Sequence, residues 1–310
     1  MAPVVNRYAQ RFYHRTKMLL RPIVGAVAVG SLHALRLTSR KRISNLTGAI
    51  LRRLGWLLPE HRVGRANLAA AFPEKTPAEI EHILAGVWDN LGRVAAEFAH
   101  LDRLRFEPSE REGPPDVGAS DIAATRFQAA RASGPTLFFA AHLANWEIPA
   151  LTAARFDLPT HVLFRPPNVP AVRDAILKIR SKSMGTLVPS SFSAPLQIAR
   201  AVENGHNAAM LVDQHDNTGT DVTFFGRTCK ANTLLAQLAR HFDCPIRGVR
   251  AIRLTDGNTF ECDLTEPLDL PRDAEGKVDV QRTTQAITSV IEGWVREHPE
   301  QWLWLHRRWR

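Results

Sequence analysis

The chain has 310 residues, 45% of them hydrophobic, which is enough to bury a large core and argues against disorder of the whole chain. A chain of this length forms one large domain or two small ones. Its three cysteines, Cys229, Cys244 and Cys262, have the spacing of neither a zinc site nor a disulfide framework, as is typical of a protein in a reducing compartment. The net charge of +9 indicates an anionic partner, which leaves nucleic acid, an acidic membrane surface or a phosphorylated substrate.

The first 65 residues alternate basic clusters with apolar stretches. The clusters are Arg7, Arg11, Arg15, Lys17 and Arg21, then Arg36, Arg40, Lys41 and Arg42, then Arg52 and Arg53. This arrangement suits an anionic bilayer surface, where each Lys or Arg near the membrane contributes about 1 kcal/mol. The apolar run after Arg21 is not followed by a small-x-small cleavage pattern, so we expect no cleaved secretory signal.

Two segments of this region are candidates for membrane contact. Residues Pro22–Leu35 are uncharged but shorter than the roughly 20 apolar residues of a spanning helix, so the pattern leaves a span and an interfacial helix open. Residues Ile43–Leu58 carry two arginines among apolar residues and Trp56 near their end, as in a helix lying at the membrane surface. A soluble amphipathic helix is the alternative. We predict a membrane-associating helical region over residues 1–60 and a second domain over residues 61–310.

The remainder of the chain alternates helical and strand-like segments. Apolar side chains at helical spacing predict a helix over Pro77–Leu104 with Thr76 as its N-cap, and a loop follows. Short apolar runs then predict strands, with helical stretches between them. The predicted strands cover residues 136–141, 160–164, 207–212 and 246–253, and the predicted helices cover residues 148–156, 171–184, 194–204 and 233–242. This alternation predicts an α/β fold, a mixed sheet flanked by helices, with functional groups near the strand ends.

The sharpest chemical feature is His142 followed by Glu147, a His-x4-acid spacing directly after the apolar run that begins at Thr136. A histidine at a strand end is in reach of a carboxylate that the following turn brings back to one ring nitrogen. The carboxylate fixes the tautomer and raises the basicity of the other nitrogen, so that the ring can deprotonate a hydroxyl. The spacing alone favours the alternative of a surface histidine and a glutamate at a helix N-terminus.

Several separated motifs accompany this pair. They are HRVGRANLAAAFPE from His61, AHLANWE around His142, FRPPNVP from Phe164, IRSKSMG around Arg180, LVDQH around Asp213, VTFFGRTCKANT up to Thr233, and HPEQWLWLHRRWR at the C-terminus. In these motifs and their order, over about residues 61–310, the chain resembles the lipid A late acyltransferases. These lauroyl/myristoyl transferases are distant relatives of the glycerolipid acyltransferases with an H-x4-D/E motif. The resemblance implies a glycerolipid-acyltransferase-like catalytic domain.

The resemblance also assigns roles to individual residues. It implies that His142 is the general base and that Glu147 is its orienting partner. It carries function onto Arg180 and onto Asp213, which is expected to position an arginine or to bind the substrate sugar. A structural role for Asp213 is the alternative.

Two further residues are candidates for substrate binding. Arg165, like Arg180, suits a phosphate or a developing oxyanion, because a guanidinium offers a fixed fork of donors and stays charged. A solvated arginine with a surface partner is the alternative for each. Lys230 lies near the start of a predicted helix, whose N-terminus favours an anion.

Two aromatic segments have two interpretations each. Phe224 and Phe225 either form an apolar wall beside an acyl chain or pack in the core. The tail WLWLHRRWR either meets anionic lipid or acyl carrier protein, or is a packed terminal strand with exposed arginines.

The function that the resemblance implies is transfer of a fatty acyl chain from acyl-acyl carrier protein to a hydroxyl, expected on a 3-hydroxyacyl chain, of a lipid A precursor in lipopolysaccharide biosynthesis. The expected partners are acyl carrier protein, the precursor and anionic membrane lipid, at the cytoplasmic face of the bacterial inner membrane. No cofactor is expected. No metal is expected either, since the histidines form no ligand cluster. A covalent acyl-enzyme is disfavoured because no Ser or Cys lies in a G-x-S-x-G context.

Three other functions stay as alternatives. The acceptor hydroxyl can belong to another glycolipid or to a glycerolipid. A nucleic-acid-binding protein fits the basic charge, but the chain has no helix-turn-helix, zinc-finger or RNP signature, so we expect no nucleic acid partner. A catalytically silent membrane protein predicts that His142 and Glu147 lie apart.

Overall fold

The computed structural model describes residue 22, residues 25–110 and residues 113–309. The basic residues from Arg7 to Arg21, which we expect beside a membrane, lie outside the described residues. Within the described ranges, no helix has the length and apolar character needed to cross a membrane.

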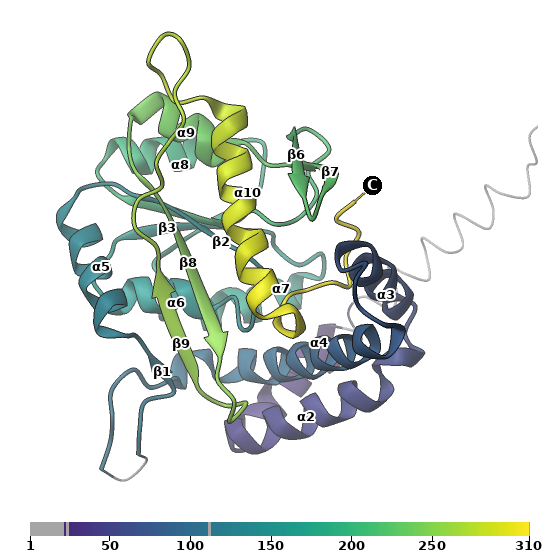
Figure 1. Cartoon of the computed structure of the whole chain (residues 1–310). Helices are drawn as coiled ribbons and strands as arrows, with labels where there is room; N and C mark the ends of the chain where they lie inside the picture. Colours follow the sequence, from purple (N-terminus) through teal and green to yellow (C-terminus); the bar gives the residue numbers. More distant parts are fainter. Residues whose placement is uncertain (1–21, 23–24, 111–112, 310) are drawn as a thin grey trace, which may run out of the picture.

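A seven-stranded sheet forms the centre of the fold, in the order β1-β9-β8-β2-β5-β3-β4 (Figure 1). Its strands are β1 (Val117–Gly118), β2 (Leu137–Ala140), β3 (Thr160–Phe164), β4 (Thr186–Pro189), β5 (Asn207–Leu211), β8 (Ile246–Arg253) and β9 (Phe260–Leu264). Every neighbouring pair is parallel except β8 and β9, which are antiparallel. The expected mixed sheet is confirmed. A separate antiparallel hairpin, β6 (Thr220–Phe224) and β7 (Arg227–Ala231), follows β5.

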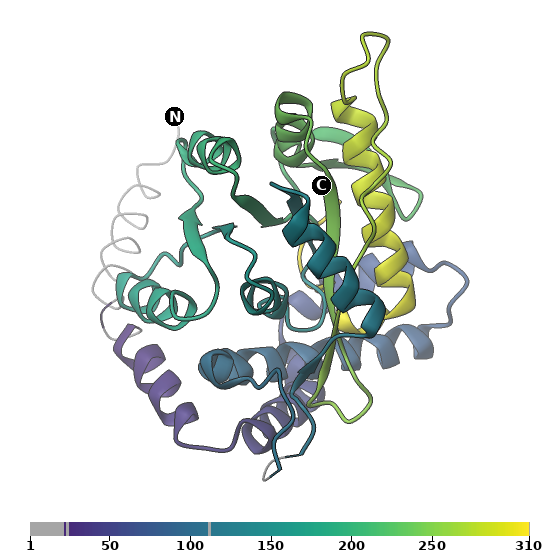
Figure 2. The same cartoon turned by 90° about the vertical axis from the view of Figure 1, so that its left-hand side faces the viewer.

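Helices cover both faces of the sheet, which explains the uninterrupted apolar run of β2. Leu137 and Phe139 point into a core shared with α8 (Ala194–Glu203), α9 (Leu234–Phe242) and α10 (Val280–Glu297). Phe138 and Ala140 point to the opposite face, against α5 (Asp121–Ala132) and α6 (Ile148–Arg155). Figure 2 shows α5 and α10 either side of the strands. β2, β3, β5 and β8 lie within the four strand ranges that the sequence predicted.

A group of helices lies at one end of the molecule (Figure 1). It consists of α2 (Arg40–Leu54), η1 (Gly55–Leu57), α3 (Glu60–Ala71) and α4 (Pro77–Glu97). The cap Thr76 exchanges hydrogen bonds with Glu79, a capping box that confirms the predicted start of α4. The α-helix ends at Glu97, and a 3₁₀ helix, η2 (Phe98–Arg103), follows it directly. The last residues of the helix predicted up to Leu104 are therefore in 3₁₀ and not in α conformation. Helix α7 (Pro170–Arg180) packs on η2 and ends before the predicted Met184.

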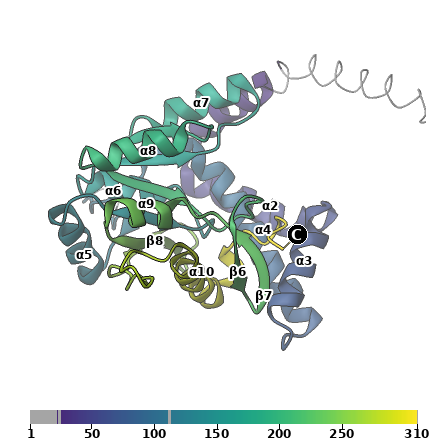
Figure 3. The ribbon, with the colours of Figure 1, turned by 90° about the horizontal axis from the view of Figure 1, so that it is seen from above.

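The C-terminal segment, which begins with η3 (Pro299–Gln301), is packed into the core rather than exposed. Trp302 and Trp304 are buried, and their rings pack against Phe224 and Phe225. The core interpretation of these two phenylalanines is therefore correct. Figure 3 shows the C-terminus beside α3 and α4. Among the described residues, the strand-type pairing of this segment is limited to an isolated bridge between Leu143 and Trp302, so the predicted terminal strand is irregular backbone.

Candidate active site

The candidate site lies where two neighbouring parallel strands end. β2 and β5 pair with Ala140 opposite Leu211, so both strands stop at the same edge of the sheet. His142 and Asp213 each follow two residues later along their own strands. The shared register therefore brings these two side chains together, although 71 positions separate them in the sequence.

Asp213 holds His142 through both its ring and its backbone. Its Oδ1 lies 2.8 Å from the ring Nδ1 of His142, and its Oδ2 accepts a hydrogen bond from the His142 backbone N–H, also at 2.8 Å. The indole N–H of Trp302 donates to the same Oδ2 at 2.8 Å. Because an ionised carboxylate only accepts, the Nδ1 atom of His142 carries the proton and Nε2 is the basic nitrogen. The amide nitrogen of Gln214 lies 3.4 Å from Nε2.

The electrostatics of the pair favour a charged carboxylate and a basic ring. Burial disfavours the protonated ring, but the charge of Asp213 and its hydrogen bond outweigh this, with a further contribution from Glu147, so the pKa of His142 lies above its ordinary value. Burial likewise opposes the charge of Asp213, yet the charge and hydrogen bond of His142 hold the pKa of this carboxyl far below its ordinary value.

Glu147 has a different partner from the expected one. Its two carboxylate oxygens accept from Arg180, at 2.8 Å from Nε and 2.5 Å from a terminal nitrogen of the guanidinium. Asp213, and not Glu147 as we predicted, accepts the hydrogen bond from the ring of His142. The reason is geometric, since Glu147 starts α6 and its side chain faces α7, which carries Arg180, whereas Asp213 follows the strand next to His142. The roles of these residues in a reaction stay predictions.

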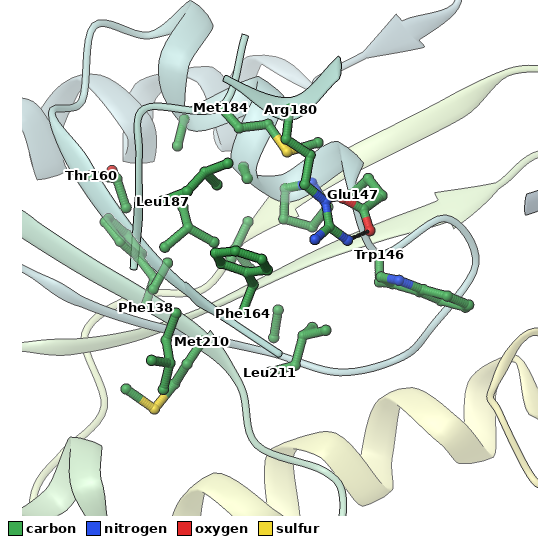
Figure 4. A pocket seen from close by; sticks show the side chains of 18 of the residues that line it. Phe138, Trp146, Glu147, Thr160, Phe164, Arg180, Met184, Leu187, Met210 and Leu211 are labelled. Atoms are coloured by element: carbon green, nitrogen blue, oxygen red, sulfur yellow. Dashed lines mark hydrogen bonds and ion pairs between the residues drawn. The ribbon is translucent and has the colours of Figure 1, made fainter. Parts of the chain in front are cut away.

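A largely apolar cavity of about 490 Å³ opens beside this pair. Its polar lining is His142, Trp146, Glu147, Arg165, Arg180, Ser190, Gln214 and Thr160. Figure 4 shows Trp146, Glu147 and Arg180 gathered at one end and Thr160 at the other. Between them lie apolar side chains of β2, β3, β5 and α6, on the face of the sheet that α5 and α6 cover. The cavity is therefore a largely apolar pocket with Glu147 and Arg180 at one end.

The six predicted site residues do not all meet at this cavity. His142, Glu147, Arg165 and Arg180 line it, although the carboxylate of Glu147 accepts from Arg180 while the ring of His142 bonds Asp213. Asp213 lies directly behind His142. Lys230 is on β7, with its ammonium 3.5 Å from a carboxylate oxygen of Asp221, and does not line the cavity.

Sequence reasoning missed Trp302 and Trp146. Trp302, near the C-terminus, donates to Asp213, and its place in the motif HPEQWLWLHRRWR was the available signal. Trp146 is half-buried, with its ring centroid 5.2 Å from that of His142, and its place inside the AHLANWE motif was the available signal.

The arrangement suits proton transfer beside an apolar chain. A buried carboxylate, an oriented imidazole and a guanidinium at the mouth of an apolar pocket provide a base, a cationic group and a place for a long hydrocarbon. Over the described residues, no group of three or more His, Cys, Asp and Glu side chains is arranged to hold a metal ion.

Comparison with known proteins adds one positive result. The family model described as bacterial lipid A biosynthesis acyltransferase matches residues 12–310 of the chain. No curated protein sequence matches the chain significantly.

Proposed function

The chain belongs to the bacterial lipid A biosynthesis acyltransferases, and from this premise we propose that it transfers a fatty acyl chain from acyl-acyl carrier protein to a hydroxyl of a lipid A precursor. The acceptor hydroxyl is expected on a 3-hydroxyacyl chain of that precursor. The single observation that carries the proposed chemistry is the His142–Asp213 pair at the mouth of the apolar cavity.

In the proposed reaction His142 is the general base. Its Nε2 takes the proton of the acceptor hydroxyl while the hydroxyl oxygen attacks the carbonyl carbon of the thioester. The new C–O bond forms, the C–S bond of the resulting tetrahedral intermediate breaks, and the departing thiolate takes the proton back from His142. Positioned general-base catalysis of this kind contributes about 10²- to 10⁴-fold.

Asp213 and Glu147 divide two tasks in this mechanism. Asp213 orients the ring and stabilises the imidazolium that forms, because it accepts from Nδ1. Glu147 holds Arg180 at the mouth of the cavity by a bidentate ion pair and adds negative charge near the ring. Arg180 and Arg165 then face either the oxyanion of the intermediate or a phosphate of the acceptor.

The acyl chain is proposed to lie in the apolar cavity. Burial of each CH₂ group contributes roughly 0.8 kcal/mol, so an apolar pocket of this depth selects a long hydrocarbon over a short one. The donor protein is acidic in this proposal, which suits a chain with a net charge of +9.

We further propose that the protein works at the cytoplasmic face of the inner membrane, bound to anionic lipid. The segment of α2, η1 and the residue after η1 exposes large apolar side chains. They are Leu46, Ile50, Leu54, Trp56, Leu57 and Leu58. Arg52 and Arg53 lie in the last turn of α2 beside them. An exposed apolar surface with flanking cations is typical of a helix that lies in the membrane interface.

The test is incubation of purified protein with a lipid A precursor and a panel of acyl-acyl carrier proteins, followed by mass spectrometry. A mass gain of one acyl group supports the proposal, and its absence with every donor contradicts it. A parallel reaction with other glycolipids and with glycerolipids tests the alternative acceptors. His142→Ala should abolish the gain, whereas His82→Ala, a histidine on α4 outside the cavity lining, should keep it.

A further inference from the structure

A buried ion pair lies beneath the loop that carries the candidate catalytic groups. The carboxylate of Glu97, at the end of α4, is fully buried and meets both terminal nitrogens of Arg253, at 2.5 and 3.0 Å. Arg253 closes β8 and is 8% exposed. Burial opposes the charge of Glu97, but the charge and hydrogen bonds of Arg253 outweigh it, so the pKa of Glu97 lies below its ordinary value.

The carboxylate of Glu97 has two further donors, which belong to different parts of the chain. Ser44 of α2 donates to Oε1 at 2.9 Å. The side-chain amide of Asn145, a fully buried residue of the loop between His142 and Glu147, donates to Oε2 at 3.0 Å. Each oxygen of Glu97 therefore accepts one hydrogen bond from Arg253 and one from another element.

Asn145 passes this anchorage on to Glu147. Its side-chain oxygen accepts the backbone N–H of Glu147 at 3.2 Å. The amide of Asn145 thus connects Glu97 with Glu147, the N-cap of α6, whose carboxylate binds Arg180.

The residue before Asn145 makes the anchorage necessary. Ala144 has φ of +46°, a conformation that a residue with a Cβ adopts only when its surroundings impose it. Its carbonyl accepts from the side-chain amide of Asn90, whose oxygen accepts from Arg253, and its N–H donates to the carbonyl of Gln301. The same buried network therefore imposes the turn between His142 and Glu147.

We propose that Glu97, Arg253 and Asn145 form a positioning unit that fixes the turn between His142 and Glu147 and so sets the relative placement of the base and of the Glu147–Arg180 pair. None of the three lines the cavity or touches the groups that react. The proposal deepens the proposed function and rests on it for its kinetic readout, although the placement of the turn can be measured without any substrate.

A purely stabilising role does not explain the choice of residues. Buried ion pairs are often replaced by apolar residues with no loss of stability, because taking two charges out of water cancels much of their attraction. Here the carboxylate of Glu97 accepts from four donors, one from Ser44 of α2, two from Arg253 of β8 and one from Asn145 of the loop. A fixed acceptor for Asn145 is something that an apolar core cannot provide.

The decisive variant is Asn145→Ala, with Asn207→Ala as its matched control. Asn207 is also buried and its side-chain amide also makes two hydrogen bonds, in this case both to backbone, with the N–H of Thr136 and the carbonyl of Pro159, at the opposite end of β2 and β5. Both variants should lower the Tm by similar amounts. We expect kcat to fall at least about tenfold for Asn145→Ala alone, since displacement of reacting groups by about 1 Å can cost about 10²-fold.

Two substrate-free measurements accompany the kinetics. NMR titration of the His142 ring should give a lower pKa in Asn145→Ala than in the parent, because the Glu147 carboxylate, whose charge helps to raise that pKa, is no longer fixed beside the ring, and no change in Asn207→Ala. Amide hydrogen exchange at residues 143–148 should accelerate in Asn145→Ala alone. If Asn145→Ala and Asn207→Ala with similar losses of Tm also show similar changes in kcat, in the pKa of His142 and in the exchange of this turn, the positioning role is wrong.

A second variant addresses the ion pair itself. Glu97→Gln together with Arg253→Gln removes both charges at once, so that neither is left buried without a partner. Its effect on kcat should not add to that of Asn145→Ala, because both act through the same turn. Additive effects would contradict the proposal. If the parent protein transfers no acyl chain, the proposed function fails, while the exchange and titration still decide on the positioning unit.

Discussion

At the scale of single residues, the site uses two carboxylates in different ways. Asp213 is buried against an imidazole, an indole and a backbone N–H, and every donor that it meets comes from the reacting histidine or from the C-terminal segment. Glu147 lies at the cavity mouth and meets a guanidinium with both oxygens. The first arrangement sets the tautomer of His142, and the second places a cation beside the pocket.

We expect Asp213→Asn to reduce kcat by about 10²-fold or more, because the amide no longer fixes the tautomer of His142 or stabilises its protonated form. The pH profile should also move. The base works in its neutral form, and Asp213 raises the pKa of the ring above 6.5, so activity in the parent rises with pH through a midpoint above 6.5. In the variant this midpoint should lie at lower pH.

The matched control is Asp216→Asn, three residues further along the same loop, where the carboxylate accepts from Thr218 and Asn232 and has no contact with His142. Initial rates from pH 5 to 9 compare the three proteins. An unchanged midpoint in Asp213→Asn would show that Asp213 does not control the base.

At the scale of elements, two helices approach each other through glycines. A Cβ added to Gly92 of α4 would lie 2.4 Å from the carbonyl oxygen of Thr47 in α2, and one added to Gly48 of α2 would lie 2.9 Å from side-chain atoms of Asp89 and Arg93. The close approach brings Ser44 within reach of Glu97, so it also serves the buried network beneath the loop.

Gly92→Ala should therefore destabilise the protein by about 1–3 kcal/mol, since the methyl group meets backbone that cannot move away without separating the helices. Gly293→Ala, in α10, is the control. A Cβ there meets nothing within 4 Å, so the helix should gain about 0.5–1 kcal/mol from the lost flexibility of glycine. Denaturant unfolding measures the change in the free energy of unfolding for each variant. A change of the same sign in both variants would contradict a steric role for Gly92.

The helix α6 should set the depth of the acyl pocket. Ala150 and Ala153 line the cavity on successive turns, the second farther from Glu147. We predict that Ala153→Leu shifts donor preference towards shorter acyl chains, because the larger side chain fills the inner part of the pocket. The neighbouring Ala154→Leu, outside the lining, should leave the preference unchanged. Competition between acyl-acyl carrier proteins of different chain length, resolved by mass spectrometry, decides between these outcomes.

At the scale of the whole molecule, apolar surface and positive charge coincide in the N-terminal helices. α2 and η1 expose large apolar side chains next to arginines, and the net charge of the chain is +9. Apolar contact and attraction to anionic lipid act together in such a surface, and salt weakens only the second.

We predict that Trp56→Glu weakens sedimentation with anionic vesicles, because Trp56 is 62% exposed beside this cationic helix end. Ile122→Glu, at 64% exposure on α5, makes the same change of charge on another element and should leave binding nearly unchanged. Binding of the parent should fall as salt rises. Equal losses in the two variants would mean that net charge, rather than this surface, governs binding.

The sequence by itself determined the α/β class, four of the seven strands of the sheet (β2, β3, β5 and β8) and the histidine that follows β2. β2 is buried on both faces and therefore appears in the sequence as an apolar run, and the Thr76 cap is a local hydrogen bond between near neighbours. Only the tertiary structure decided which carboxylate meets His142. Glu147 is five residues away and Asp213 is 71, yet strand register puts the distant one against the ring. The pairing of Glu97 with Arg253 and the burial of Trp302 likewise depend on contacts between distant parts of the chain, so the spacing of residues along the sequence does not predict them.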